Sequence, residues 1–189
     1  MTASDAEIVA IVRQGNRDAF GTLVERYQRQ LFALVLMVVR DSAGAEEVTQ
    51  DAFVRAFAHL DAYDDRRPLY PWLATIAVRL SHNWLRSHGR SVSREGVSID
   101  DVGEPERPAT ALQSLIAVEE SRHVWNAVSS LPSGERTAVM LYYRDEMPVS
   151  DIARALGVTA GTIKTLLFRA RRHLRERMAR TQTDGAASR

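Results

Sequence analysis

Apolar residues recur at helical spacing along most of the chain and predict a protein built from α-helices. They line one face of helices expected at about 18–40, 45–60 and 72–87. No run of alternating apolar and polar residues is long enough to indicate a strand. The expected fold class is therefore all-α.

A polar stretch after Ser87 divides this helical pattern into two parts. From there to Ala111 the chain is rich in Gly, Ser, Asp, Glu and Pro, and buries too little apolar surface to offset the entropy of ordering. Further helices are predicted at about 112–129, 133–144, 150–156 and 160–180. The sequence thus predicts two small helical domains at residues 1–90 and 112–180, a flexible acidic linker at 91–111, and a disordered tail at 181–189.

Capping residues indicate a helix-turn-helix in the C-terminal part. Ser150 is suited to cap a short helix, Gly157 to close it in a left-handed conformation, and Thr159 to cap the next helix. Ser4 and Glu7 likewise predict a capping box near the N-terminus. At about 100° per residue, the apolar stripe of the second C-terminal helix consists of Ile163, Leu167, Ala170 and Leu174.

Basic side chains gather on the other side of that helix. Between Lys164 and Arg180, a single acid, Glu176, stands against Lys164 and six arginines. Such a helix can make several phosphate contacts whose affinity falls as salt rises, and the pattern is typical of a helix in the DNA major groove. The alternative is a solvated amphipathic helix without a ligand.

Composition narrows the class of protein further. The 189 residues are 45% hydrophobic and 26% charged, and the net charge of +1 conceals an acidic block at 46–65, a basic block at 66–94 and an acidic block at 95–106. The absence of cysteine excludes disulfides, zinc–thiolate sites and a cysteine nucleophile. The longest apolar run, 31–39, is too short to span a bilayer, and residues 1–10 lack the features of a secretory signal, so we expect a cytoplasmic protein.

The sequence offers no set of residues for catalysis. Its five histidines are not spaced as metal-binding pairs, and no glycine-rich phosphate loop is present. We therefore expect no catalytic residues, no metal site, no cofactor and no enzymatic activity.

Several strings, taken in order, resemble a known family. In the first half they are AEEVTQDAF at 45–53 and LYPWLATIA at 69–77; in the second they are LPSGER at 131–136, GTIK at 161–164 and RARR at 169–172. Their order and separation resemble the extracytoplasmic-function (group IV) sigma factors of bacterial RNA polymerase, a branch of the sigma-70 family. The resemblance covers nearly the whole chain, with sigma region 2 in the first domain and region 4 in the second.

The resemblance implies a role in promoter recognition, DNA opening and transcription initiation. It implies that region 2 binds core RNA polymerase and the −10 promoter element, while region 4 binds the −35 element. The acidic linker would thread toward the polymerase active-site and RNA-exit channels. The face implied to dock on the β and β′ subunits of core polymerase consists of Glu46, Glu47, Gln50 and Asp51.

The DNA contacts are also implied by the resemblance. Unstacked bases need aromatic surfaces and basic side chains on the backbone, and Trp72 is equally suited to a core position, where we also place Trp84. The residues implied to contact the −10 element are Arg66, Arg67, Tyr70, Trp72, Arg79, Asn83 and Arg86. The residues implied to contact the −35 element are Thr162, Lys164, Thr165, Phe168, Arg169, Arg171 and Arg172.

The sequence departs from the family pattern at two sites. Val78 and Arg79 stand where many members carry Arg-Asn, which predicts an unusual −10 preference, and Leu166 replaces a frequent Arg, which removes one DNA contact. Family members are commonly controlled by an anti-sigma factor, and the resemblance implies such a partner here. Two alternatives stay open: a conventional helix-turn-helix regulator that binds duplex operator DNA without polymerase, and an interaction protein whose basic helices are covered by another chain.

Overall fold

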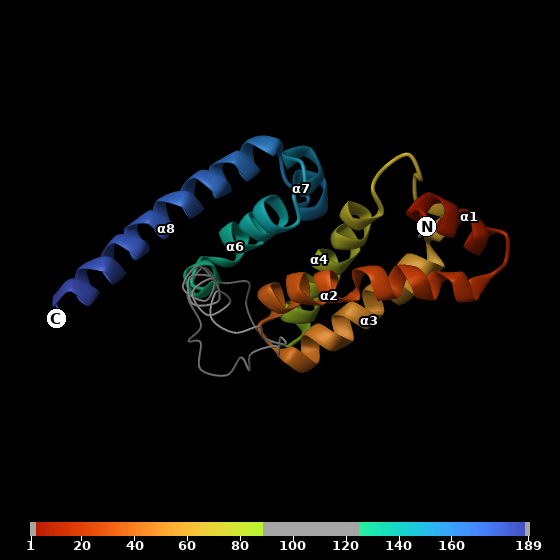
Figure 1. Ribbon diagram of the computed structural model, residues 1–189, viewed down its shortest axis with the longest axis horizontal. Helices are drawn as coiled ribbons and strands as arrows, with labels where there is room; N and C mark the ends of the chain where they lie inside the picture. The colour runs from red at the N-terminus through yellow and green to blue at the C-terminus, as the bar shows by residue number, and fades with distance from the viewer. Residues whose placement is uncertain (1–2, 89–124, 188–189) are drawn as a thin grey trace.

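The structure, a computed structural model, describes residues 3–88 and 125–187, with side-chain environments through Met178 (Figure 1). The described residues form helices and contain no strand, which confirms the all-α prediction. The predicted linker at 91–111 and most of the predicted helix at 112–129 lie outside the described residues.

The N-terminal half is a bundle of three long helices with a short one packed on it (Figure 1). Its elements are α1 (Asp5–Arg13), the 3₁₀ turn η1 (Arg17–Ala19), α2 (Phe20–Val39), α3 (Ser42–Ala58), the 3₁₀ turn η2 (Leu60–Ala62) and α4 (Leu69–Ser87). Helices α2, α3 and α4 pack against one another, and α1 packs on α2. Their buried faces are the apolar stripes that the helical spacing predicts.

Capping residues fix where these helices begin and end. Ser4 and Glu7 form the predicted capping box, with the Ser4 amide 2.7 Å from Glu7 Oε2 and the Glu7 amide 3.3 Å from Ser4 Oγ. Arg40 ends α2 in a left-handed conformation (φ 57°), and Asp41 Oδ1 then accepts the amide of Gly44 at 2.7 Å to begin α3. These neighbouring residues produce the sharp corner between α2 and α3.

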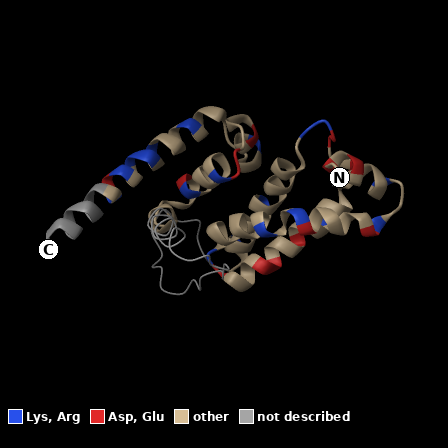
Figure 2. Ribbon diagram, in the orientation of Figure 1, with Lys and Arg blue, Asp and Glu red and all other residues tan. Residues whose placement is uncertain are grey.

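The C-terminal half is a second, smaller set of helices. Residues 125–129 are helical, and the elements that follow are α6 (Ser133–Val139), the π-helical turn η3 (Met140–Arg144), α7 (Val149–Leu156) and α8 (Ala160–Ala187). Helix α8 packs on α6 and α7 and extends past them, with basic residues along it (Figure 2).

The turn between α7 and α8 forms as its residues predict. Gly157 adopts a left-handed conformation (φ 67°) and closes α7. The Thr159 hydroxyl then accepts the amide of Thr162 at 3.2 Å and caps α8. The helix-turn-helix is thus set by one glycine and one threonine.

Several helix ends differ from the sequence prediction. Helix α3 begins at Ser42 rather than at 45, and α4 begins at Leu69 rather than at 72. Ser150 does not cap α7, because the helix begins one residue earlier, at Val149, after Pro148 has fixed φ at −60° for the entry into the helix. Helix α8 continues to Ala187 and so includes most of the tail predicted at 181–189. A helix that is already formed adds residues at little cost, which explains the longer α8.

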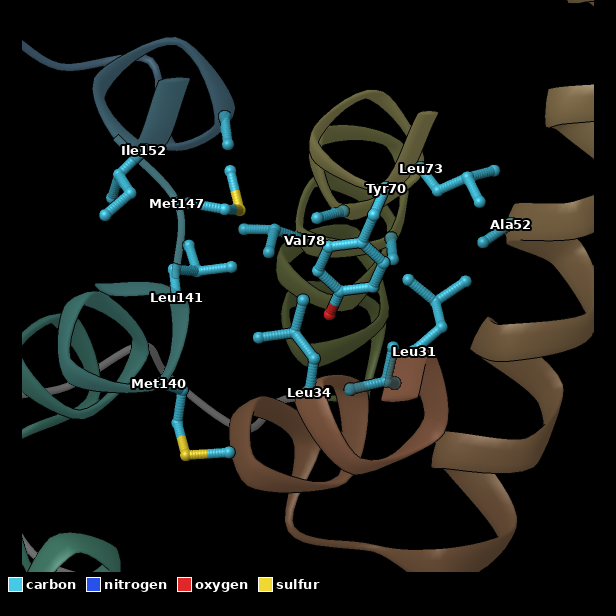
Figure 3. Close-up of a cluster of buried hydrophobic side chains, with 14 of the residues drawn as sticks. Leu31, Leu34, Ala52, Tyr70, Leu73, Val78, Met140, Leu141, Met147 and Ile152 are labelled. Carbon is cyan, nitrogen blue, oxygen red and sulfur yellow. The ribbon is translucent and has the colours of Figure 1, made fainter. Parts of the chain in front are cut away.

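The two halves share one hydrophobic core. Helix α4 packs on α7, and α2 packs on α6. Tyr70 and Val78 of α4 are buried in the same cluster as Leu141 and Met147 of the C-terminal half (Figure 3). Because full burial of such an apolar side chain stabilises by about 1.5–3 kcal/mol, these contacts hold the two halves together.

Gly44 is the glycine that the packing of the first half requires. A Cβ atom at this position would lie 2.7 Å from Cε2 of Trp84. The Trp84 indole cannot easily move away, because its Nε1 donates to Glu47 at 2.9 Å and its ring stacks on His88 at 4.1 Å. Glycine therefore allows α3 and α4 to approach each other here.

We predict that Gly44→Ala destabilises the protein by about 1–3 kcal/mol, because overpacking of a filled site costs that amount. The measurement is urea denaturation followed by circular dichroism. Gly21→Ala on α2 is the matched control, since its added Cβ meets no atom within 4 Å, and we expect it to be neutral or stabilising. Equal stability of the two variants would contradict the proposed role of Gly44.

Candidate nucleic-acid interface

An acidic face covers the solvent side of α3. The apolar side of the helix is buried against α2 and α4, so its polar residues point outward. The four residues predicted for polymerase docking are exposed there: Glu46, Glu47, Gln50 and Asp51. The structure thus brings together the predicted set on one helix face.

Two further residues belong to this face. Trp84 of α4 donates its indole N–H to Glu47 Oε2 at 2.9 Å and so orients that carboxylate, although its ring also packs against the core. Val54 is 66% exposed, and at about 100° per residue it lies between Glu47 and Gln50 around the helix axis. Val54 was not identified from the sequence. The pattern that could have identified it is an apolar residue among the polar positions of the helix.

Basic residues predicted for −10 DNA lie on the loop before α4 and along α4. Arg66 and Arg67 are exposed on the loop and pair with Asp64 at 3.2 and 3.5 Å. The backbone N–H of Arg66, followed by its side chain, lowers the pKa of Asp64, so this carboxylate stays ionised. The other three predicted polar residues are exposed on one side of α4 at helical spacing: Arg79, Asn83 and Arg86.

The two aromatic residues predicted for −10 DNA are less accessible. Tyr70 is only 7% exposed: its hydroxyl donates to Asp145 Oδ2 of the C-terminal half at 2.8 Å, and its ring lies 5.9 Å from that of Tyr27 in its own half. Burial raises the pKa of Tyr70 far above its usual value, so it stays protonated. Trp72 is half-buried, with its ring 5.2 Å from that of Tyr63.

Helix α8 has one buried and one exposed face. The predicted apolar stripe is confirmed, with Ile163, Leu167 and Ala170 buried and Leu174 packed against the core. Phe168 is 65% exposed, which is unusual for phenylalanine on a helix surface. The residues predicted for −35 DNA are all exposed: Thr162, Lys164, Thr165, Phe168, Arg169, Arg171 and Arg172.

A buried polar cluster centred on Asp145 joins the two halves. The Asp145 side chain is 0% exposed and lies 2.7 Å from Arg144 Nε. It accepts hydrogen bonds from Tyr70 at 2.8 Å and from Gln30 Nε2 at 3.1 Å, both in the N-terminal half. Arg144 also donates to the Gln30 carbonyl at 3.1 Å. Sequence reasoning missed this cluster, since no local pattern pairs residues so far apart.

The described residues contain no group that suggests a metal site or a membrane span. Their His, Asp and Glu side chains nowhere gather in threes as metal ligands would. None of their helices combines the length and the hydropathy that crossing a bilayer requires.

Comparisons with known proteins identify both halves. The family model for Sigma-70 region 2 matches residues 23–91, and the model for Sigma-70, region 4 matches residues 121–174. The chain is 31% identical over 181 residues to the ECF RNA polymerase sigma-E factor of Escherichia coli (strain K12), covering 89% of this chain and 91% of that protein. The chain belongs to the ECF RNA polymerase sigma factors.

Other relatives agree with this assignment. This sigma factor is 29% identical to the ECF RNA polymerase sigma factor SigW of Bacillus subtilis (strain 168), over 88% of this chain and 92% of SigW. It is 30% identical to the probable RNA polymerase sigma factor RfaY of Xanthomonas campestris pv. campestris over 87% of this chain, but spans only 41% of RfaY.

Solved structures share the fold of this sigma factor. The sigma factor RpoE of Bartonella quintana, solved with the anti-sigma factor NepR, is 26% identical, with a TM-score of 0.66 over 83% of this chain and 94% of that one. CnrH, solved with the cytosolic domain of CnrY, has a TM-score of 0.64 at 24% identity, over 93% of this chain and 97% of that one, and supports the fold alone.

We predict that Asp145→Asn destabilises the compact form of the sigma factor by about 2 kcal/mol, because hydrogen bonds to a charged group are lost at a buried position. Denaturant unfolding measures the loss, and small-angle scattering reports any separation of the halves. Asp151→Asn is the matched control, since its pair with Arg154 at 2.8 Å lies at the surface, with the Arg154 side chain 54% exposed, and contributes little. Equal effects of the two substitutions would contradict the role of Asp145 in holding the two halves together.

Proposed function

We propose that this sigma factor binds core RNA polymerase, directs it to promoters and helps to open the DNA. The observation that carries the proposal is that one chain has two exposed faces of opposite charge, an acidic face on α3 and a basic face on α8. The first suits a basic protein partner and the second suits duplex DNA. RNA synthesis belongs to the polymerase, so this chain contributes binding rather than catalysis, and acts in the cytoplasm where polymerase works.

The α3 face has the composition of a protein interface. Val54 supplies an exposed apolar side chain at one end of the face, and Glu46, Glu47, Gln50 and Asp51 supply the polar groups in the turns before it. Protein interfaces commonly combine apolar contacts with polar groups. The acidic residues then orient a basic surface of the β and β′ subunits, while Val54 adds an apolar contact with that partner.

The α8 face is proposed to enter the major groove at the −35 element. Lys164 and Arg172 carry charges for phosphates or base edges. Phe168, exposed beside them, offers an apolar surface for a thymine methyl group. The face therefore combines affinity for the backbone with a preference among bases.

Contact of Tyr70 with the −10 element requires a change in the compact arrangement. Arg79, Asn83 and Arg86 are already exposed on α4, whereas Tyr70 lies beneath Asp145. A base can stack on Tyr70 only after the C-terminal half has moved away. Promoter opening by this chain therefore includes separation of its two halves.

An anti-sigma factor is the proposed regulator. The related RpoE of Bartonella quintana is solved with the anti-sigma factor NepR. A partner of that kind holds this chain inactive most directly by stabilising the compact arrangement, in which Tyr70 is covered.

Promoter-dependent initiation tests the proposed function. Purified bacterial core polymerase, with and without this protein, transcribes a pool of random promoter-length DNA, and the 5′ ends of the transcripts are sequenced. We expect starts that require the protein and share paired upstream elements. Specific binding to duplex operator by the protein alone, without such starts, would favour a conventional helix-turn-helix regulator.

Charge reversal tests the docking face. We predict that combining Glu47→Lys with Asp51→Lys lowers affinity for core polymerase at least about tenfold, because two attractive charges become repulsive. Arg172→Ala on α8 is the control: it keeps core affinity and weakens promoter binding by the assembled holoenzyme. Core affinity that survives the reversal would reject the α3 face.

A further inference from the structure

Tyr143 makes a contact with α8 from outside the helix-turn-helix. It lies on η3, is 53% exposed, and its hydroxyl accepts a hydrogen bond from Arg171 Nε at 2.7 Å. The Arg171 Cζ atom also lies 5.8 Å from the centre of the Tyr143 ring, within the range of a cation–π contact. Because η3 continues α6, and α6 packs on α8, this tyrosine is held beside the basic helix.

Arg171 stands at the edge of the exposed face of α8. At 100° per residue it projects about 20° from Lys164 and about 60° from Phe168, and about 80° from Ile163 at the buried stripe. Its hydrogen bond to Tyr143 places it where this face borders on η3. Tyr143 extends the surface of α8 onto a second element.

The contact leaves the ends of both side chains free for an anion. The hydrogen bond to Tyr143 uses Nε of Arg171, and within the described part of the chain its two terminal nitrogens make no hydrogen bond or ion pair. Those nitrogens carry four N–H donors in a planar fork that matches a phosphate. The Tyr143 oxygen accepts from Arg171, so its own O–H can donate to the same phosphate.

We propose that Tyr143 is a positioning residue of the −35 interface, which holds the Arg171 guanidinium toward a DNA phosphate and adds a hydroxyl donor beside it. This inference rests on the proposed function, since it requires α8 to meet DNA. An arginine fixed in advance loses less side-chain entropy on binding than a free one. The pair therefore acts on promoter affinity rather than on the choice of base.

A contribution to folding stability explains the contact between Tyr143 and Arg171 less well than a role in DNA binding. Tyr143 is exposed and its ring meets Tyr142 edge to face at 4.9 Å, a contact that phenylalanine at 143 would keep. Exposed substitutions of this kind usually change stability little. Loss of the single hydroxyl is thus expected to leave the fold intact and to change DNA binding.

A double-mutant cycle with the assembled holoenzyme tests the proposal. Promoter dissociation constants are measured over a salt series for wild type, Tyr143→Phe, Arg171→Ala and the double variant, with Tyr142→Phe as the matched control. We expect Tyr143→Phe to weaken promoter binding about three- to tenfold with core affinity unchanged, and to have little further effect once Arg171 is alanine. Arg171→Ala should also lower the slope of log affinity against log salt by about one.

Arg171→Lys separates positioning from charge. Lysine keeps the positive charge but lacks the planar fork, so Tyr143→Phe should have little effect in the lysine background as well. Additive losses from Tyr143 and Arg171, or an equal loss from Tyr142→Phe, would overturn the proposal. A wild-type holoenzyme that selects no promoter would overturn the proposed function itself, and this inference with it.

Discussion

The carboxylate of Asp145 constrains how the two halves of this sigma factor pack. A charge that is removed from water is tolerated only where it is paired and hydrogen-bonded. Arg144 supplies the pairing from the same half, while Tyr70 and Gln30 supply hydrogen bonds from the other. The carboxylate therefore has its full set of partners only when the halves are together, and this requirement fixes the register of α4 against the C-terminal half.

The same polar centre makes the interface separable. Water can replace Tyr70 and Gln30 around Asp145, and Arg144 remains beside it when the halves part. Arg136 makes a second polar contact, donating to the Met37 carbonyl at 2.7 Å, where a cation meets the negative end of α2. Burial lowers the pKa of Arg136 to about 10, so it remains charged at neutral pH. Interfaces between domains that move relative to each other typically include polar contacts among the apolar ones.

Local signals were enough to predict most helices but not the contacts between them. The capping box at Ser4, the left-handed Gly157 and the buried stripe of α8 follow from spacing within a few residues. The exposed faces of α3 and α8 follow from the same periodicity. Tyr70 differs, because its hydroxyl pairs with Asp145, a residue 75 positions away that helical spacing cannot relate to it. The end of α8 differs for another reason. The polar composition after 180 predicts a disordered tail, whereas a helix that has already formed favours adding further helical residues.

The surfaces proposed to bind polymerase and duplex DNA are exposed in the compact form. Part of the surface proposed to bind melted DNA is buried. Glu47 and Phe168 are exposed, so polymerase and duplex DNA can meet α3 and α8 directly. Stacking a base on Tyr70 requires both the unstacking of DNA, which costs a few kcal/mol, and the opening of the Asp145 contact. Both costs arise when the promoter DNA opens. The proposed contacts with polymerase and with the −35 element form before that step and can offset them. In the proposed function, the compact form thereby withholds the Tyr70 ring from single-stranded DNA.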